Sequence, residues 1–246
     1  MDEPLTKRDH AILRFVDSGE LVAMRHLTAC FFGQRKTARA RVLSLSERGL
    51  LARYRASRAS ETLYTLGALG AALLGVQRRM RMPERKLETH LDALDICIAF
   101  ARGSIEASLL GHAPRAPDIV ATLDRYVLHV VLDPLDRPPD ELARKLAMLA
   151  RPSPSAPSLI VLASRRDARL LAVARGVPSG ETPIACLRLP VRGSALGPCY
   201  ARVDVLARVR SRQELRAAFS MRLVSETLAP LARTWNDESR VGAPRS

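Results

Sequence analysis

Hydrophobic side chains recur every three or four residues in the first part of the chain, and this spacing predicts three successive helices. Thr6 and Asp9 have the spacing of a capping box at the start of the first helix. The second helix is expected over residues 21–32 and the third over residues 34–48. A glycine follows each of these two, as is common where a helix ends.

A pair of strands is predicted after the third helix. Residues 50–55 and 61–66 alternate between apolar and polar positions on either side of a polar turn at residues 56–60, which indicates a hairpin. Residues 68–76 have the small apolar side chains of a short closing helix. Three helices followed by a hairpin are the order of a winged helix-turn-helix domain.

The second half of the chain follows a different pattern. Short apolar runs predict strands at residues 119–123, 126–132, 159–163 and 184–189. Helical patterns lie between them, at residues 139–151 and 165–175, and a further helix is expected over residues 87–103. Strands that alternate with helices favour an α/β domain with a mixed sheet.

These patterns predict an α+β protein with two domains. We expect a winged-helix domain over residues 1–82, a linker helix over 83–112, and an α/β domain with a C-terminal helix over 113–246. The C-terminal helix is expected to carry an apolar stripe from Leu215 to Trp235. That stripe either covers the protein's own sheet or forms an interface.

The chain is strongly basic, with 39 Lys and Arg against 25 Asp and Glu and a formal net charge of +14. This balance favours polyanionic partners, with nucleic acid ahead of membranes. No apolar run reaches the roughly 18 residues that a membrane span needs, and the first residues have no signal-peptide core. The four cysteines lack zinc-site spacing. We therefore expect a cytoplasmic protein with no metal, cofactor or membrane partner.

The basic residues are concentrated on the third helix and the hairpin. Residues 35–58 hold eight basic side chains and one acidic one, about half of the net charge in a tenth of the chain. Such clustering is either a solvated surface or the electrostatic footprint of duplex DNA binding, which we favour. The candidate DNA-binding residues are Gln34, Arg35, Lys36, Thr37, Arg39 and Arg41 on the helix, with Arg55, Ser57 and Arg58 on the hairpin. Reversal of Arg39 and Arg41 to Glu is expected to abolish binding without unfolding the protein.

A candidate nuclease site lies in the second domain. Asp118 precedes one predicted strand, Asp133 ends the next, and Lys145 lies on the following helix. A metal-dependent nuclease needs two carboxylates that converge on Mg²⁺ and a lysine near the attacked phosphate. However, the usual acid-x-Lys element is missing after Asp133, and Val131 stands where a second strand acid would be useful. The pattern favours a non-catalytic relative of such nucleases.

The chain also resembles a known family. The resemblance is carried by LTKRDHAILRFV, RHLTACFF, TARARVLSLSERGLLARY and LYTLGALG, followed by His90 at the opening of a helix. These segments are similar to those of actinobacterial and plasmid-associated replication-relaxation proteins. The resemblance implies a winged helix followed by a restriction-endonuclease-like domain, with family-like acids at Asp118 and Asp133 and a helix lysine at Lys145. Val131 departs from the family, which more often has an acid there.

We therefore expect a sequence-selective double-stranded DNA-binding protein that acts in transcription regulation or in replication control of a plasmid or mobile element. A homodimer is expected, because winged-helix proteins often bind double half-sites as dimers. Two alternatives stay open. One is a metal-dependent DNA nickase or nuclease, and the other is an α/β domain that serves as a partner-binding or dimerisation module.

Overall fold

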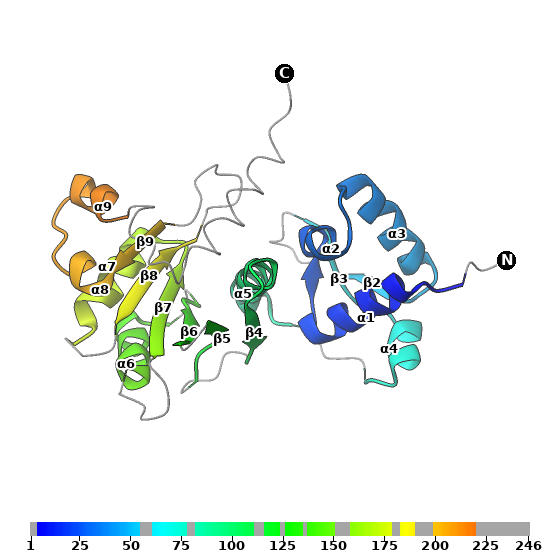
Figure 1. Cartoon of the computed structure of the whole chain (residues 1–246), viewed down its shortest axis with the longest axis horizontal. Helices are drawn as coiled ribbons and strands as arrows, with labels where there is room; N and C mark the ends of the chain where they lie inside the picture. Colours follow the sequence, from blue (N-terminus) through cyan, green and yellow to red (C-terminus); the bar gives the residue numbers. More distant parts are fainter. Residues whose placement is uncertain are drawn as a thin grey trace, which may run out of the picture. The chain divides into compact units, whose positions relative to one another are not determined.

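The computed structural model describes residues 4–54, 61–77, 82–110, 116–123, 126–134, 137–150, 158–178, 183–189 and 199–219. The chain forms two compact units, Met1–Ile98 and Ala99–Ser246, and Figure 1 shows the elements of each. The boundary falls inside helix α5, Glu84–Arg102. Most of the helix expected as a linker therefore belongs to the first unit.

Three helices open the first unit. They are α1 (Lys7–Gly19), α2 (Met24–Phe31) and α3 (Arg35–Glu47). The predicted capping box at the start of α1 is confirmed. The Asp9 amide donates to the Thr6 hydroxyl at 3.2 Å, and the Asp9 carboxylate accepts from the Thr6 amide at 2.7 Å.

A small antiparallel sheet completes the fold of the first unit. The predicted pair of strands is present as β2 (Leu51–Tyr54) and β3 (Leu63–Leu66). A further strand, β1 (Val22–Ala23), pairs with β3, so that the strand order is β1-β3-β2. The predicted start of the second helix at residue 21 is therefore wrong, because residues 22 and 23 are extended to pair with β3. The short helix α4 (Ala68–Leu74) follows.

The inward stripes of the helices are buried as the hydrophobic spacing predicts. The fully buried apolar side chains of α1, α2 and α3 are Ile12, Leu13, Val16, Leu27, Ala38, Val42 and Leu45, and Leu63 of β3 is fully buried as well. Helix α5 adds Leu87 and Leu91, which cluster with Leu63 of the central strand. The first part of α5 is thus a component of this core.

The second unit is built on a six-stranded mixed sheet. Its strands are β4 (Glu106–Leu109), β5 (Ile119–Leu123), β6 (Tyr126–Leu132), β7 (Ser158–Ser164), β8 (Ile184–Arg188) and β9 (Cys199–Arg202). They lie side by side in sequence order. The pairs β6–β7 and β7–β8 are parallel and the other three pairs are antiparallel. The predicted mixed sheet is confirmed, although the sequence pattern predicts neither β4 nor β9.

Helices pack on one face of this sheet (Figure 1). They are α6 (Pro139–Leu149), α7 (Asp167–Gly176), α8 (Val203–Leu206) and α9 (Arg212–Ala218). Helix α6 connects the parallel strands β6 and β7, and α7 connects β7 and β8, because parallel neighbours need a crossover connection. Their apolar residues bury Val131, Ile160, Leu162 and Cys186, the side chains that point to this face.

The predicted C-terminal helix is shorter than expected. Helix α9 ends at Ala218, and Phe219 leaves the helical backbone and packs into the core of the second unit. The Arg188 guanidinium lies 4.5 Å from the centre of the Phe219 ring. The rest of the expected stripe, up to Trp235, lies outside the described residues. Within the described ranges, no helix is long and apolar enough to cross a membrane.

Candidate nucleic-acid interface

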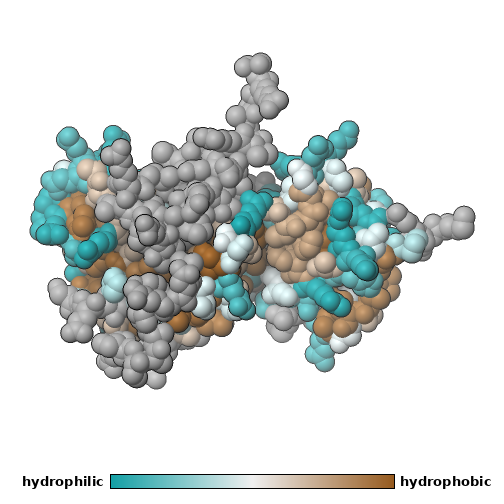
Figure 2. Space-filling model, viewed as in Figure 1, coloured by the Kyte–Doolittle hydropathy of each residue, from teal (hydrophilic) through white to brown (hydrophobic). Residues whose placement is uncertain are grey.

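Helix α3 carries a basic surface at its amino-terminal end. Its inner face is buried, whereas five of the predicted contact residues are exposed: Gln34, Arg35, Lys36, Thr37 and Arg39. The first turn contains no acidic residue, and the side chain at the N-cap position makes no capping hydrogen bond. No first-turn carboxylate therefore offsets the positive end of the helix dipole, and such a helix end attracts anions. In the space-filling view, hydrophilic residues lie along the α3 side of the first unit (Figure 2).

The sixth predicted residue on this helix, Arg41, is held by a partner inside the protein. Its Nε and Nη2 atoms donate to the two carboxylate oxygens of Asp9, at 2.8 and 2.5 Å. The side chain of Asp9 is 1% exposed and that of Arg41 is 18% exposed. The hydrogen bonds from Arg41 are the main reason that the pKa of Asp9 lies well below its usual value. Arg41 therefore ties α3 to α1.

This pairing corrects one expectation from the sequence. Reversal of Arg41 to Glu would place a second carboxylate beside the buried Asp9 carboxylate, and an unpaired buried charge is strongly destabilising. The reversal is therefore expected to disrupt the first unit, and only Arg39 can be reversed as a test of DNA binding alone.

The small sheet adds a basic side chain next to α3. Arg53 of β2 is exposed and lies opposite Tyr64 of β3 in the strand register. Burial raises the pKa of Tyr64, whereas the nearby guanidinium groups of Arg53 and Arg39 act in the opposite direction. Because both arginines lie near this one side chain, helix and sheet share one positive surface. The predicted hairpin contacts Arg55, Ser57 and Arg58 lie outside the described residues.

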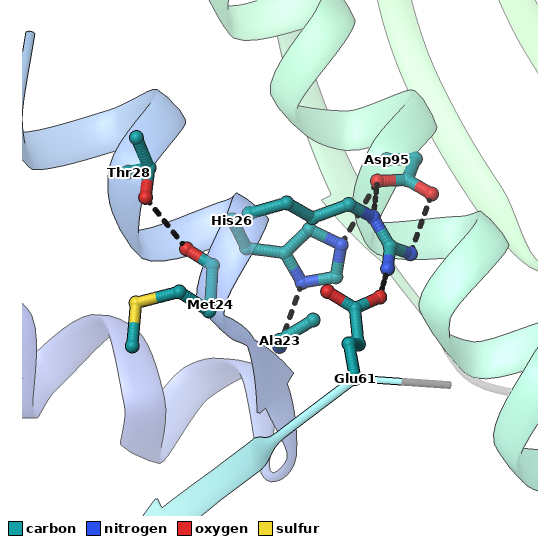
Figure 3. Close-up of polar contacts among 7 residues, drawn as sticks. Ala23, Met24, His26, Thr28, Glu61 and Asp95 are labelled. Carbon is teal, nitrogen blue, oxygen red and sulfur yellow. Dashed lines mark hydrogen bonds and ion pairs between the residues drawn. The ribbon is translucent and has the colours of Figure 1, made fainter. Parts of the chain in front are cut away.

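Helix α2, which leads into α3, is attached to α5 by a cluster of polar contacts (Figure 3). Arg25 donates from Nε and Nη2 to the Asp95 carboxylate, at 2.9 and 2.8 Å, and its other terminal nitrogen pairs with Glu61. The buried His26 ring accepts the Ala23 amide on Nδ1 at 3.2 Å. Its proton is therefore on Nε2, which donates to Asp95 at 2.9 Å.

These contacts fix the position of α2 relative to α5. Burial by itself would raise the pKa of Asp95, but the hydrogen bonds from His26 and Arg25 outweigh it and lower that pKa well below its usual value. The His90 ring nitrogen Nε2 adds contacts to the backbone oxygens of Gly19 and Leu21, at 2.8 and 3.1 Å. No local pattern in the sequence identifies this cluster, because its contacts join residues that are up to 71 positions apart.

The three residues of the candidate nuclease site are buried in the second unit. Asp118, Asp133 and Lys145 are 2%, 6% and 6% exposed. The Lys145 ammonium lies 3.5 Å from one oxygen of Asp118, which also accepts the Leu132 amide at 2.8 Å. Burial lowers the pKa of Lys145, and the Asp118 carboxylate acts against this shift. Asp118 and Lys145 thus form a buried ion pair between α6 and the start of β5.

Asp133 has a different set of partners. Its carboxylate accepts from the Ser164 hydroxyl at 2.8 Å and from Nε and Nη2 of Arg169 at 3.1 and 2.6 Å. Each of the two carboxylates is therefore balanced by a cation of the protein, Asp118 by Lys145 and Asp133 by Arg169. In the part of the chain that the structure describes, no three His, Cys, Asp or Glu side chains are grouped so that they could hold a metal ion.

No protein family, curated protein or solved structure matches the chain.

Proposed function

We propose that the chain is a sequence-selective double-stranded DNA-binding protein that inserts the start of α3 into the major groove. The observation that carries this proposal is the exposed basic end of α3, where Arg35, Lys36 and Arg39 are exposed while the opposite face of the helix is buried. The guanidinium groups of Arg39 and Arg53 both lie near Tyr64. The major groove is wide enough to admit one α-helix. Arg35 and Gln34 are suited to guanine and adenine edges, and the other cations to phosphates.

The order of elements in the first unit supports the same proposal. In a winged helix-turn-helix protein, the helix before the recognition helix crosses the DNA backbone and the following hairpin lies beside the groove. Here α2 and α3 would have those roles, and β2 and β3 would form the wing. The cluster at Asp95 would hold α2 in the orientation that this docking needs.

The proposed biological role is transcription regulation or replication control of a plasmid or mobile element, in the cytoplasm. It follows from the resemblance to replication-relaxation proteins. A homodimer that binds two half-sites is part of the proposal. Sedimentation of the free protein and of its complex with duplex DNA would test it, with two chains per duplex as the expected result.

Duplex binding measured by fluorescence anisotropy across a salt series tests the proposal. DNA from upstream of the protein's own gene is compared with a scrambled duplex of equal length. Wild type should prefer one duplex over the other, and Lys36→Ala with Arg39→Ala should weaken binding and reduce the salt slope by about 2, because each lost phosphate contact removes about one. The matched control is Arg212→Ala with Arg216→Ala, which removes two exposed charges from α9. If the control weakens binding as much as the α3 variant, the proposed interface is wrong.

One arrangement favours a second candidate function, a Mg²⁺-dependent nickase in the second unit. The run β4, β5, β6, α6, β7 resembles the core of restriction-endonuclease-like proteins, and Asp118 contacts Lys145 at one end of the sheet. We nevertheless propose that this unit is not a nuclease, because the cations at Asp118 and Asp133 occupy the carboxylates that a metal would need. Incubation of the protein with supercoiled plasmid and Mg²⁺ or Mn²⁺ distinguishes a nickase from a second unit that does not cleave DNA. Nicking by wild type that is lost in Asp118→Ala would establish the nickase.

A further inference from the structure

The outward face of α3 contains an apolar centre within its basic surface. A helix turns by about 100° per residue around its axis. On this geometry, one row on the side opposite the buried face spans about 60° and contains Lys36, Ala40, Leu43 and Glu47. All four are exposed. Charged side chains therefore stand at the two ends of this row, and Ala40 and Leu43 occupy its centre.

Leu43 is unusual for a solvent-facing position of this helix. Its side chain is 39% exposed and is the one large hydrophobic on α3 that is exposed. A leucine has no hydrogen-bonding group, so it can bind neither a phosphate nor the polar edge of a base. In the major groove, the apolar group available to such a side chain is the C5-methyl of thymine. Ala40 is small enough to allow the groove floor to approach the helix.

The charges around this row suggest where the DNA would lie. Arg39 and Arg53 are exposed on the side of α3 that faces the sheet, and Lys36 begins the row. Glu47 ends the row with a carboxylate, which repels phosphate. A duplex would therefore be held over the first turns of α3, with Leu43 at the far end of the contacted part of the helix.

We propose that Leu43, supported by Ala40, determines sequence preference by packing against the methyl group of a thymine in the bound half-site. This inference rests on the proposed function of α3. It assigns to this surface a duplex that contains thymine at one defined position. Gln34 and Arg35 would read neighbouring base pairs by hydrogen bonds.

The experiment uses full-length protein and a duplex selected from a random-sequence pool. Each thymine of the selected duplex is replaced in turn by uracil, which differs only by the missing C5-methyl group. Wild type should lose about fourfold in affinity at one thymine, the change that corresponds to burial of about one methyl group. Leu43→Ala should bind the thymine and uracil duplexes equally, and alanine favours the helix, so this variant should fold.

A matched control separates this contact from general effects of removing a leucine. Leu73→Ala removes a side chain that is 47% exposed on α4. This variant should keep the wild-type preference for thymine. Equal binding of every thymine and uracil duplex by wild type would overturn the assignment, as would full discrimination by Leu43→Ala. If no duplex is selected from the pool, it is the proposed DNA binding that fails.

Discussion

The pair formed by Asp9 and Arg41 provides a sharp test of the difference between a structural and a DNA-binding arginine. The perturbation is Arg41→Ala, which removes both donors to a carboxylate that is 1% exposed. Its control is Arg39→Ala, an exposed arginine two positions earlier on the same helix. The first variant should lower stability, whereas the second should lower DNA affinity.

The expected loss of stability follows from the burial of the pair. Removing one partner of a buried ion pair costs about 3–5 kcal/mol. Arg41 is 18% exposed, and Asp9 keeps two hydrogen bonds from Thr6, so we expect about 3 kcal/mol, at the lower end of that range. The Arg39→Ala control should change the free energy of unfolding by no more than about 0.5 kcal/mol.

The effect should depend on pH in a defined direction. The pKa of folded Asp9 is lowered from the ordinary value of 3.8, so the pair stabilises the protein fully above that value and less as the pH falls below it. Without Arg41, burial raises the pKa of Asp9 and only the Thr6 hydrogen bonds lower it, so the carboxylate is protonated at a higher pH than in wild type. The difference between wild type and Arg41→Ala should therefore be largest near pH 7 and should shrink progressively as the pH falls below about 4.

Urea unfolding of the full chain, followed by hydrogen exchange of peptides from α1 and α3, measures this stability. Asp9→Asn combined with Arg41→Ala serves as a second control, because it removes the buried charge as well and should be less destabilised than Arg41→Ala alone. A loss below about 0.5 kcal/mol at pH 7, the range of ordinary surface substitutions, would refute the reasoning. So would a loss that is the same at pH 7 and pH 3.

Three further predictions concern other buried groups. Asp95→Ala should destabilise the first unit by about 2 kcal/mol, because it removes the carboxylate that accepts from the buried His26 ring and from Arg25, and unchanged urea unfolding would contradict this. Lys145→Met should cost about 3 kcal/mol by removing the cation that lies beside the buried Asp118 carboxylate, and adding Asp118→Asn should restore most of the loss in the same assay. Burial raises the pKa of Cys97 to about 12, so iodoacetamide at pH 8 should alkylate the exposed Cys30 and spare Cys97. Peptide mass mapping measures this labelling, and equal modification of both would show that Cys97 is accessible.

The sequence by itself determined most of the helices and the long strands. Helix boundaries depend on caps and on the spacing of apolar residues, both of which are local, and Thr6 and Asp9 form the predicted capping box. Strands β1, β4 and β9 were not predictable in this way. They are two to four residues long, β1 and β9 show no alternation, and the alternation of β4 extends over only four residues. They form because a neighbouring strand offers unpaired backbone groups at the edge of a sheet.

Only the tertiary structure decided which charged residues are available. Arg39 and Arg41 are the same residue type on the two flanks of one helix, and the difference between them comes from Asp9, which is 32 positions earlier in the chain. Likewise, Asp118 and Lys145 are recognisable as candidates from their order, but Asp133 finds its cation in Arg169, 36 positions later. Burial and ion pairing depend on groups that are distant in sequence and meet only in the folded chain, so no local pattern encodes them.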